Sequence, residues 1–99
     1  MLTEPEARRL AEAEIARLCE EGRAYFDPED TFVVSAMEEC SIGWVYHYQS
    51  ARYLRTGEST AALGGNAPIL IGRRNGAILP TGTAYPIEHY IRDHEVSGE

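Results

Sequence analysis

The chain has 99 residues, of which 43% are hydrophobic and 9% aromatic, which is enough apolar material for one folded core. Sixteen acidic residues against nine basic ones give a formal net charge of −7, which argues against binding the phosphate backbone of a nucleic acid. No segment approaches the ~20 apolar residues that cross a bilayer, and residues 1–10 do not resemble a secretory signal. We therefore expect a cytoplasmic protein with neither nucleic acid nor membrane as a partner.

The first predicted element is a helix from about residue 4 to about residue 21. Thr3 and Glu6 have the spacing of a capping box, Pro5 suits a first helical turn, and Gly22 suits the end of a helix. Glu14 interrupts the apolar face; it either lies at an edge and reaches solvent or is buried beside an arginine or tyrosine. The residues at helical spacing that form this face are Ala7, Leu10, Ala11, Ile15 and Leu18.

Residues 27–30 predict an acidic loop, and residues 31–37 predict a first strand. Residues 38–41 are expected to turn the chain into a second strand at 42–50, IGWVYHYQS, in which Ile42, Trp44, Tyr46 and Tyr48 share one face. Such a face is typical of a core, but the same residue types mark binding hot spots, so a partly exposed Tyr46 or Tyr48 is the second interpretation. Residues 51–54 suit either a helical turn or an extension of this strand.

Residues 64–80 predict an antiparallel hairpin. Gly65 and Asn66 favour turn conformations, and Pro68 precedes three successive apolar residues, so both faces of a strand at 69–71 should be covered. Asn75-Gly76 is typical of a two-residue type I′ turn, which would place residue 74 opposite 77 and residue 72 opposite 79. The pairing should end at residue 80, a proline without an N–H group.

The last predicted element is a short helix that begins at Pro86, after the segment that contains Gly82 and Thr83. Residues 95–99 are expected to fray. The sum is an α+β fold of two layers: an N-terminal helix, a four-stranded antiparallel β-meander and a C-terminal helix, with both helices on one face of the sheet. We expect one domain over residues 1–99, with its core at about 5–94.

No catalytic, cofactor or metal site is predicted. Cys40 and His47 form the best cysteine–histidine pair, but the neighbouring carboxylates disfavour a thiolate. His89 and Asp93 lack a clearly placed third metal ligand. The spacing of Cys19 and Cys40 favours free thiols and leaves a disulfide open. We therefore expect a protein that is not an enzyme and for which a small-molecule ligand is disfavoured.

Four motifs stand out along the chain: GWVYHYQS (43–50), YLRTGE (53–58), GGNAPILIGRRNGA (64–77) and GTAYPIEHYI (82–91). Together they resemble the immunity protein 35 family, also called YrhB-like, over about residues 5–94. Gly72 departs from the family pattern, which usually has an aspartate there. The resemblance implies a bacterial antitoxin that binds and neutralises a cognate polymorphic toxin. The positions expected to define the fold are Trp44, Gly65, Asn66, Pro68, Asn75, Gly76, Gly82, Thr83 and Pro86.

We expect neutralisation by stoichiometric occlusion of the toxin, whose active-site cleft would be basic. Two acidic segments flank the first predicted strand and together would face that cleft, tyrosines of the second strand would anchor the contact, and two arginines near the hairpin tip would add to it. The alternatives are solvated turns at these positions, a chaperone-like or scaffolding protein, or a small enzyme or ligand-binding domain with a pocket around His47, Tyr46 and Glu14. The predicted partner-binding residues are Asp27, Glu29, Asp30, Glu38, Glu39, Tyr46, Tyr48, Arg73 and Arg74.

Overall fold

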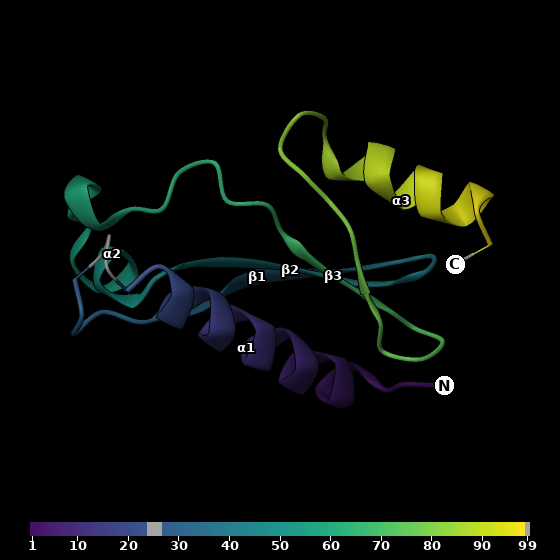
Figure 1. Ribbon diagram of the computed structural model, residues 1–99, viewed down its shortest axis with the longest axis horizontal. Coiled ribbons are helices and arrows are strands. Elements are labelled where there is room, and N and C mark those ends of the chain that lie inside the picture. Colours follow the sequence, from purple (N-terminus) through teal and green to yellow (C-terminus); the bar gives the residue numbers. More distant parts are fainter. Residues whose placement is uncertain (24–26, 99) are drawn as a thin grey trace.

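The structure is a computed structural model that describes residues 1–23 and 27–98. Its four strands form one antiparallel sheet in the order β1-β2-β3-β4, so that β1 and β4 are the edges (Figure 1). The predicted α+β class and the order helix, four-stranded meander, helix are confirmed. The elements are α1 (Glu4–Glu21), β1 (Phe32–Cys40), β2 (Gly43–Ser50), α2 (Ala51–Thr56), the 3₁₀ turn η1 (Ser59–Ala61), β3 (Ile69–Gly72), β4 (Ile78–Leu79) and α3 (Ile87–Val96).

Helix α1 has the predicted bounds because its ends are encoded locally. The Glu6 carboxylate accepts hydrogen bonds from the Thr3 backbone N–H at 3.0 Å and from the Thr3 hydroxyl at 2.9 Å. The buried face is narrower than expected: Leu10 is 41% exposed, whereas a ridge with a spacing of four residues is buried. Small side chains on that ridge let the helix approach the sheet closely. The buried residues are Ala7, Ala11, Ile15 and Cys19.

The two long helices lie on opposite faces of the sheet, so the expectation that both cover one face is wrong (Figure 1). Helix α1 packs against Trp44, Tyr46 and the isoleucines of β3, whereas α3 packs through Ile87 and Ile91 against a second cluster that contains Val45. Successive residues of a strand point to opposite faces, and β2 and β3 are apolar at successive positions. Each face of these strands therefore needs its own cover.

The β1–β2 hairpin has a tighter turn than predicted. Cys40 pairs with Gly43, so the turn is Ser41–Ile42, and Glu38 and Glu39 lie inside β1 rather than in the turn. The Ile42 side chain joins the cluster beneath α3, not the face of Trp44 that we expected. A β-bulge interrupts the register of β1 between Val34 and Ala36, which makes Ser35 the extra residue.

Five residues, 73–77, connect β3 and β4, and the predicted two-residue turn is wrong. Gly72 donates its N–H to Ala77 at 2.8 Å, so the register differs by two residues from the expected one. Among the described residues only glycines have positive φ, so Asn75 does not adopt the type I′ conformation. The physical reason lies in Arg73, whose N–H donates to Ile42 at 2.7 Å and whose carbonyl accepts from Leu2 at 3.0 Å. Its backbone is therefore not free to pair with β4.

The C-terminal part follows the prediction with small shifts. The pairing of β4 ends before Pro80, and Pro86 is the N-cap of α3 rather than its first residue. Residues 95 and 96, which were expected to fray, belong to α3, and Glu99 lies outside the described residues. Within residues 1–23 and 27–98, no helix combines the length and the hydrophobicity needed to cross a bilayer.

Candidate functional site

The two predicted acidic segments lie at opposite ends of β1. From residue 30 to residue 38 the chain advances by eight steps of ~3.3 Å, which gives about 26 Å in extended conformation. Figure 1 shows the first segment beside α2 and the β1–β2 turn at the other end of the molecule. The strand between the two segments holds them apart, so they do not form one continuous acidic patch, and their facing a single cleft stays a prediction.

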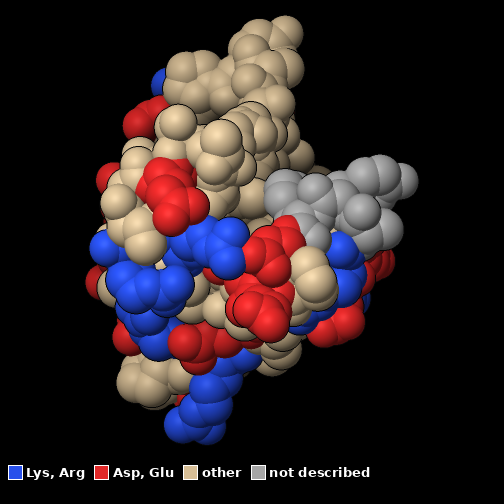
Figure 2. Space-filling model, turned by 90° about the vertical axis from the view of Figure 1, so that its left-hand side faces the viewer, with Lys and Arg blue, Asp and Glu red and all other residues tan. Residues whose placement is uncertain are grey.

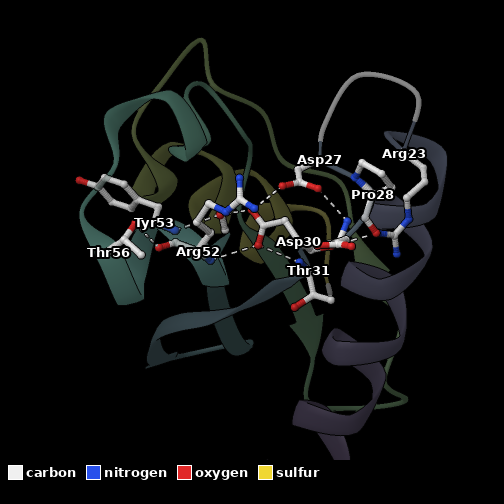
Figure 3. Close-up of polar contacts among 10 residues, drawn as sticks. Arg23, Asp27, Pro28, Asp30, Thr31, Arg52, Tyr53 and Thr56 are labelled. Carbon is white, nitrogen blue, oxygen red and sulfur yellow. Dashed lines mark hydrogen bonds and ion pairs between the residues drawn. The ribbon is translucent and has the colours of Figure 1, made fainter.

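Asp30 is engaged in a network within the fold (Figure 3). Its carboxylate accepts hydrogen bonds from the backbone N–H groups of Thr31 at 2.8 Å and Arg52 at 3.1 Å, and from the hydroxyl of Ser50. The same hydroxyl accepts from the Tyr53 N–H at 3.1 Å and so caps α2. Burial raises the pKa of Asp30, but these hydrogen bonds and the charge of Arg52 together outweigh burial and lower it. Asp30 thus fastens the loop to the start of α2.

Asp27 has a similar structural role. It forms an ion pair with Arg52, and its carboxylate accepts from the Glu29 N–H at 2.9 Å. Arg23 donates to the carbonyls of Pro28 at 2.6 Å and of residue 30 at 3.0 Å (Figure 3). Figure 2, which faces this end of the molecule, shows arginines interleaved with carboxylates rather than a uniformly acidic surface. Glu29 is exposed and forms no ion pair within the described part of the chain.

At the opposite end Arg73 holds the hairpin against β3. Its guanidinium lies 4.7 Å from the centroid of the Trp44 ring, donates to the Cys40 carbonyl at 2.8 Å and forms an ion pair with Glu39 at 2.9 Å. Glu38 and Arg74, by contrast, are exposed and form no ion pair within residues 1–23 and 27–98. Of the charged residues predicted to bind a partner at this end, these two are free to do so.

The two predicted tyrosine anchors differ in burial. Tyr46 is 0% exposed, and its hydroxyl donates to a Glu4 carboxylate oxygen at 2.8 Å. Burial raises the pKa of Tyr46, and the Glu4 carboxylate raises it further. Tyr46 is therefore a core residue, and its predicted role as an exposed anchor is wrong. Tyr48 is half-buried against Phe32, and burial likewise raises its pKa.

The pocket expected for a ligand-binding domain does not assemble. Tyr46 and His47 are successive residues of β2 and so point to opposite faces. Glu14 combines the two alternatives considered for it: its side chain is 16% exposed and pairs with Arg17 at 2.7 Å. The hydrogen bond from Arg17 lowers the pKa of Glu14 against the effect of burial. A pocket of ≈ 270 Å³ does lie between the C-terminal half of α1 and residues 62–66, and Tyr48 lines it.

The cysteine and histidine singled out in the sequence as the best pair lie apart in the structure. His47 pairs with Ala36 of β1, and Cys40 lies four residues further along the same strand. The two residues are therefore separated by about 13 Å along the sheet. Both cysteines are free. Within residues 1–23 and 27–98, no three histidine, cysteine or carboxylate side chains are grouped closely enough to hold a metal ion.

Sequence reasoning missed two features of this surface. The first is the pair of contacts that α2 makes with the acidic loop, from Ser50 to Asp30 and from Arg52 to Asp27. A serine directly before a possible helical turn was the signal in the sequence that Ser50 caps a helix. The second is that β1 is a long edge strand with partly exposed apolar side chains, of which Val33 is 38% and Met37 36% exposed. Strand β1 mixes polar and apolar residues, whereas β3 contains the apolar run ILI, and this difference was a weak signal that β1 lies at the edge of the sheet.

Comparison with known proteins defines the class. The sequence profile described as Immunity protein 35 matches residues 6–93. The uncharacterized protein YrhB of Escherichia coli (strain K12) is 38% identical over 73 residues, which cover 73% of this chain and 78% of that protein. No solved structure matches significantly. The chain belongs to the immunity protein 35 family.

Proposed function

We propose that this chain is a bacterial immunity protein that binds a cognate polymorphic toxin and neutralises it by stoichiometric occlusion in the cytoplasm of the producing cell. The observation that carries the proposal is the family match over residues 6–93. The charge supports it, because a net charge of −7 attracts a basic partner over a long range. In this mechanism the protein acts as a bound obstacle and not as an enzyme.

The free charges indicate how the toxin would be met. Glu38 and Arg74 lie at one end of the sheet and Glu29 at the other, whereas the remaining predicted charges form contacts within the chain. Tyr48 adds a half-buried aromatic side chain. We therefore reduce the proposed partner-binding set to Glu29, Glu38, Tyr48 and Arg74, with Glu39 as a peripheral member because its side chain is 62% exposed.

The test requires a gene for a large secreted protein beside this gene, and the C-terminal domain of that protein is called here the neighbouring toxin domain. Cells that express this domain should lose viability, and co-expression of the chain should restore it; the two proteins should then purify together. A toxin domain from an unrelated immunity pair is the matched control and should not be neutralised. Equal killing with and without the chain would contradict the proposal.

A chaperone-like function is the second candidate, and one observation favours it. Several large apolar side chains are exposed on the surface: Leu10 is 41%, Ile78 48% and Leu54 51% exposed. Such surfaces suit weak contacts with many partially unfolded proteins, whereas an immunity protein binds one partner tightly. Suppression of aggregation of heated citrate synthase distinguishes the two: a chaperone suppresses it at near-stoichiometric amounts, and an immunity protein leaves it unchanged.

A further inference from the structure

Strand β1 is a long edge strand without a neighbour on its outer side in the described part of the chain. It has nine residues, and the side chains at positions 33 and 35–39 are exposed. Exposed edge strands of this length are uncommon, because their outward N–H and C=O groups pair readily with other chains. The opposite edge, β4, has only two residues and ends before Pro80. The two edges therefore differ sharply in what they offer a partner.

The hairpin turn indicates which backbone groups of β1 point outward. Cys40 and Gly43 flank a two-residue turn, and residues in this position exchange hydrogen bonds with each other. Alternation then directs the backbone of Glu38 toward β2 and the backbones of Met37 and Glu39 away from the sheet. A strand from another protein would find its hydrogen-bonding groups at these two residues.

The side chains along this edge add specificity. Met37 is 36% exposed and shares a face with Tyr46, its partner in β2, whereas Glu38 shares the other face with Val45. Glu38 has no ion pair within residues 1–23 and 27–98, while Glu39 is neutralised by Arg73. The outer edge thus combines free backbone groups, an apolar side chain and one unneutralised carboxylate.

We propose that β1 is the docking strand for the toxin: an extended basic segment of the toxin adds to it and becomes a fifth strand of the sheet. This inference rests on the proposed function and specifies its contact. Charge selects the occupant, because a second copy of a chain with net charge −7 would bring like charges together. A toxin strand with a lysine or arginine opposite Glu38 gains attraction there, and the backbone ladder supplies affinity.

The experiment compares Met37→Pro with Met37→Ala, using the neighbouring toxin domain inactivated by substitution as the probe. Proline removes one outward N–H and leaves the β1–β2 ladder in place, whereas alanine keeps the N–H and removes the side chain. We expect affinity to fall by roughly 100-fold or more for proline and by less than about 10-fold for alanine, as measured by isothermal titration calorimetry. Glu38→Gln should weaken binding at low salt and reduce its salt dependence.

Hydrogen exchange keeps the proposal falsifiable if the proline variant does not fold. The amides of Met37 and Glu39 should exchange rapidly in the free wild-type protein and slowly in the complex. If Met37→Pro binds the toxin domain as tightly as Met37→Ala, β1 is not the docking strand, but the proposed function still stands. The same conclusion follows if the two amides stay unprotected in the complex. Amides already protected in a free dimer would assign the edge to a second copy and also overturn it. Failure of the wild-type protein to bind would overturn the function and the inference together.

Discussion

Gly43 and Gly72 face each other across β2 and β3, yet only one of them should tolerate alanine. A Cβ on Gly43 would lie 1.9 Å from the Ile71 carbonyl oxygen and 3.1 Å from the Arg73 nitrogen. A Cβ on Gly72 would meet nothing closer than the Leu79 Cδ1 atom at 3.5 Å, which is an ordinary contact. The close approach at Gly43 is between backbones, so no side-chain rotation relieves it and the strands must separate.

Overpacking of this kind costs about 1–3 kcal/mol, and we expect Gly43→Ala at the upper end because the obstacle is main chain. At ~4–8 °C per kcal/mol for a chain of this size, the Tm should fall by roughly 12–24 °C. Gly72→Ala should change the free energy of unfolding by less than ~1 kcal/mol, with a gain from the stiffer unfolded chain. Urea unfolding followed by circular dichroism measures both. Equal midpoints for Gly43→Ala and the wild type, or an equal loss in both variants, would refute the reasoning.

Three further substitutions test the contacts that hold the fold together. Asp30→Asn should lower the free energy of unfolding by about 1–3 kcal/mol at pH 7. Because folding lowers the pKa of Asp30, the difference between variant and wild type should shrink as the pH falls below about 4. A constant difference between pH 7 and pH 3 in urea unfolding would contradict this. Tyr46→Phe removes the hydroxyl that donates to Glu4 and should lower the free energy of unfolding by about 1–2 kcal/mol. Because burial raises the pKa of Tyr46, this loss should be complete below about pH 10 and should shrink above it. Urea unfolding at pH 8 and pH 10.5 measures the difference. Arg73→Lys keeps the charge but loses the planar contact with Trp44, so the tryptophan emission maximum should shift to longer wavelength, and an unchanged spectrum would argue against that contact.

The features predicted well from sequence are those encoded by neighbouring residues. The bounds of α1 follow from Thr3, Glu6 and Gly22, which lie within the helix or beside it. The end of β4 follows from Pro80 alone, which has no N–H to donate. In both cases the decisive contact or constraint spans only a few residues, so the sequence pattern contains the whole cause.

The features predicted poorly depend on contacts between distant parts of the chain. The β3–β4 register depends on Arg73, whose backbone partners Leu2 and Ile42 lie far away in the sequence. Asp30 and Glu38 are similar as acidic surface candidates, but Asp30 meets Ser50 twenty residues later and becomes structural. The division of carboxylates into those that hold the fold and those free to bind therefore emerges only from the folded chain.

Titration of toxin activity tests the central claim most directly. Increasing amounts of the purified chain are added to a fixed amount of the active neighbouring toxin domain at a concentration far above the dissociation constant, and residual toxin activity is measured after equilibration. If the chain acts as a bound obstacle, toxin activity should fall linearly as the chain is added. It should reach zero at one chain per toxin domain and stay there. Inactivation by far less than one equivalent would show turnover, and full activity in the presence of excess chain would show that the two proteins are not partners.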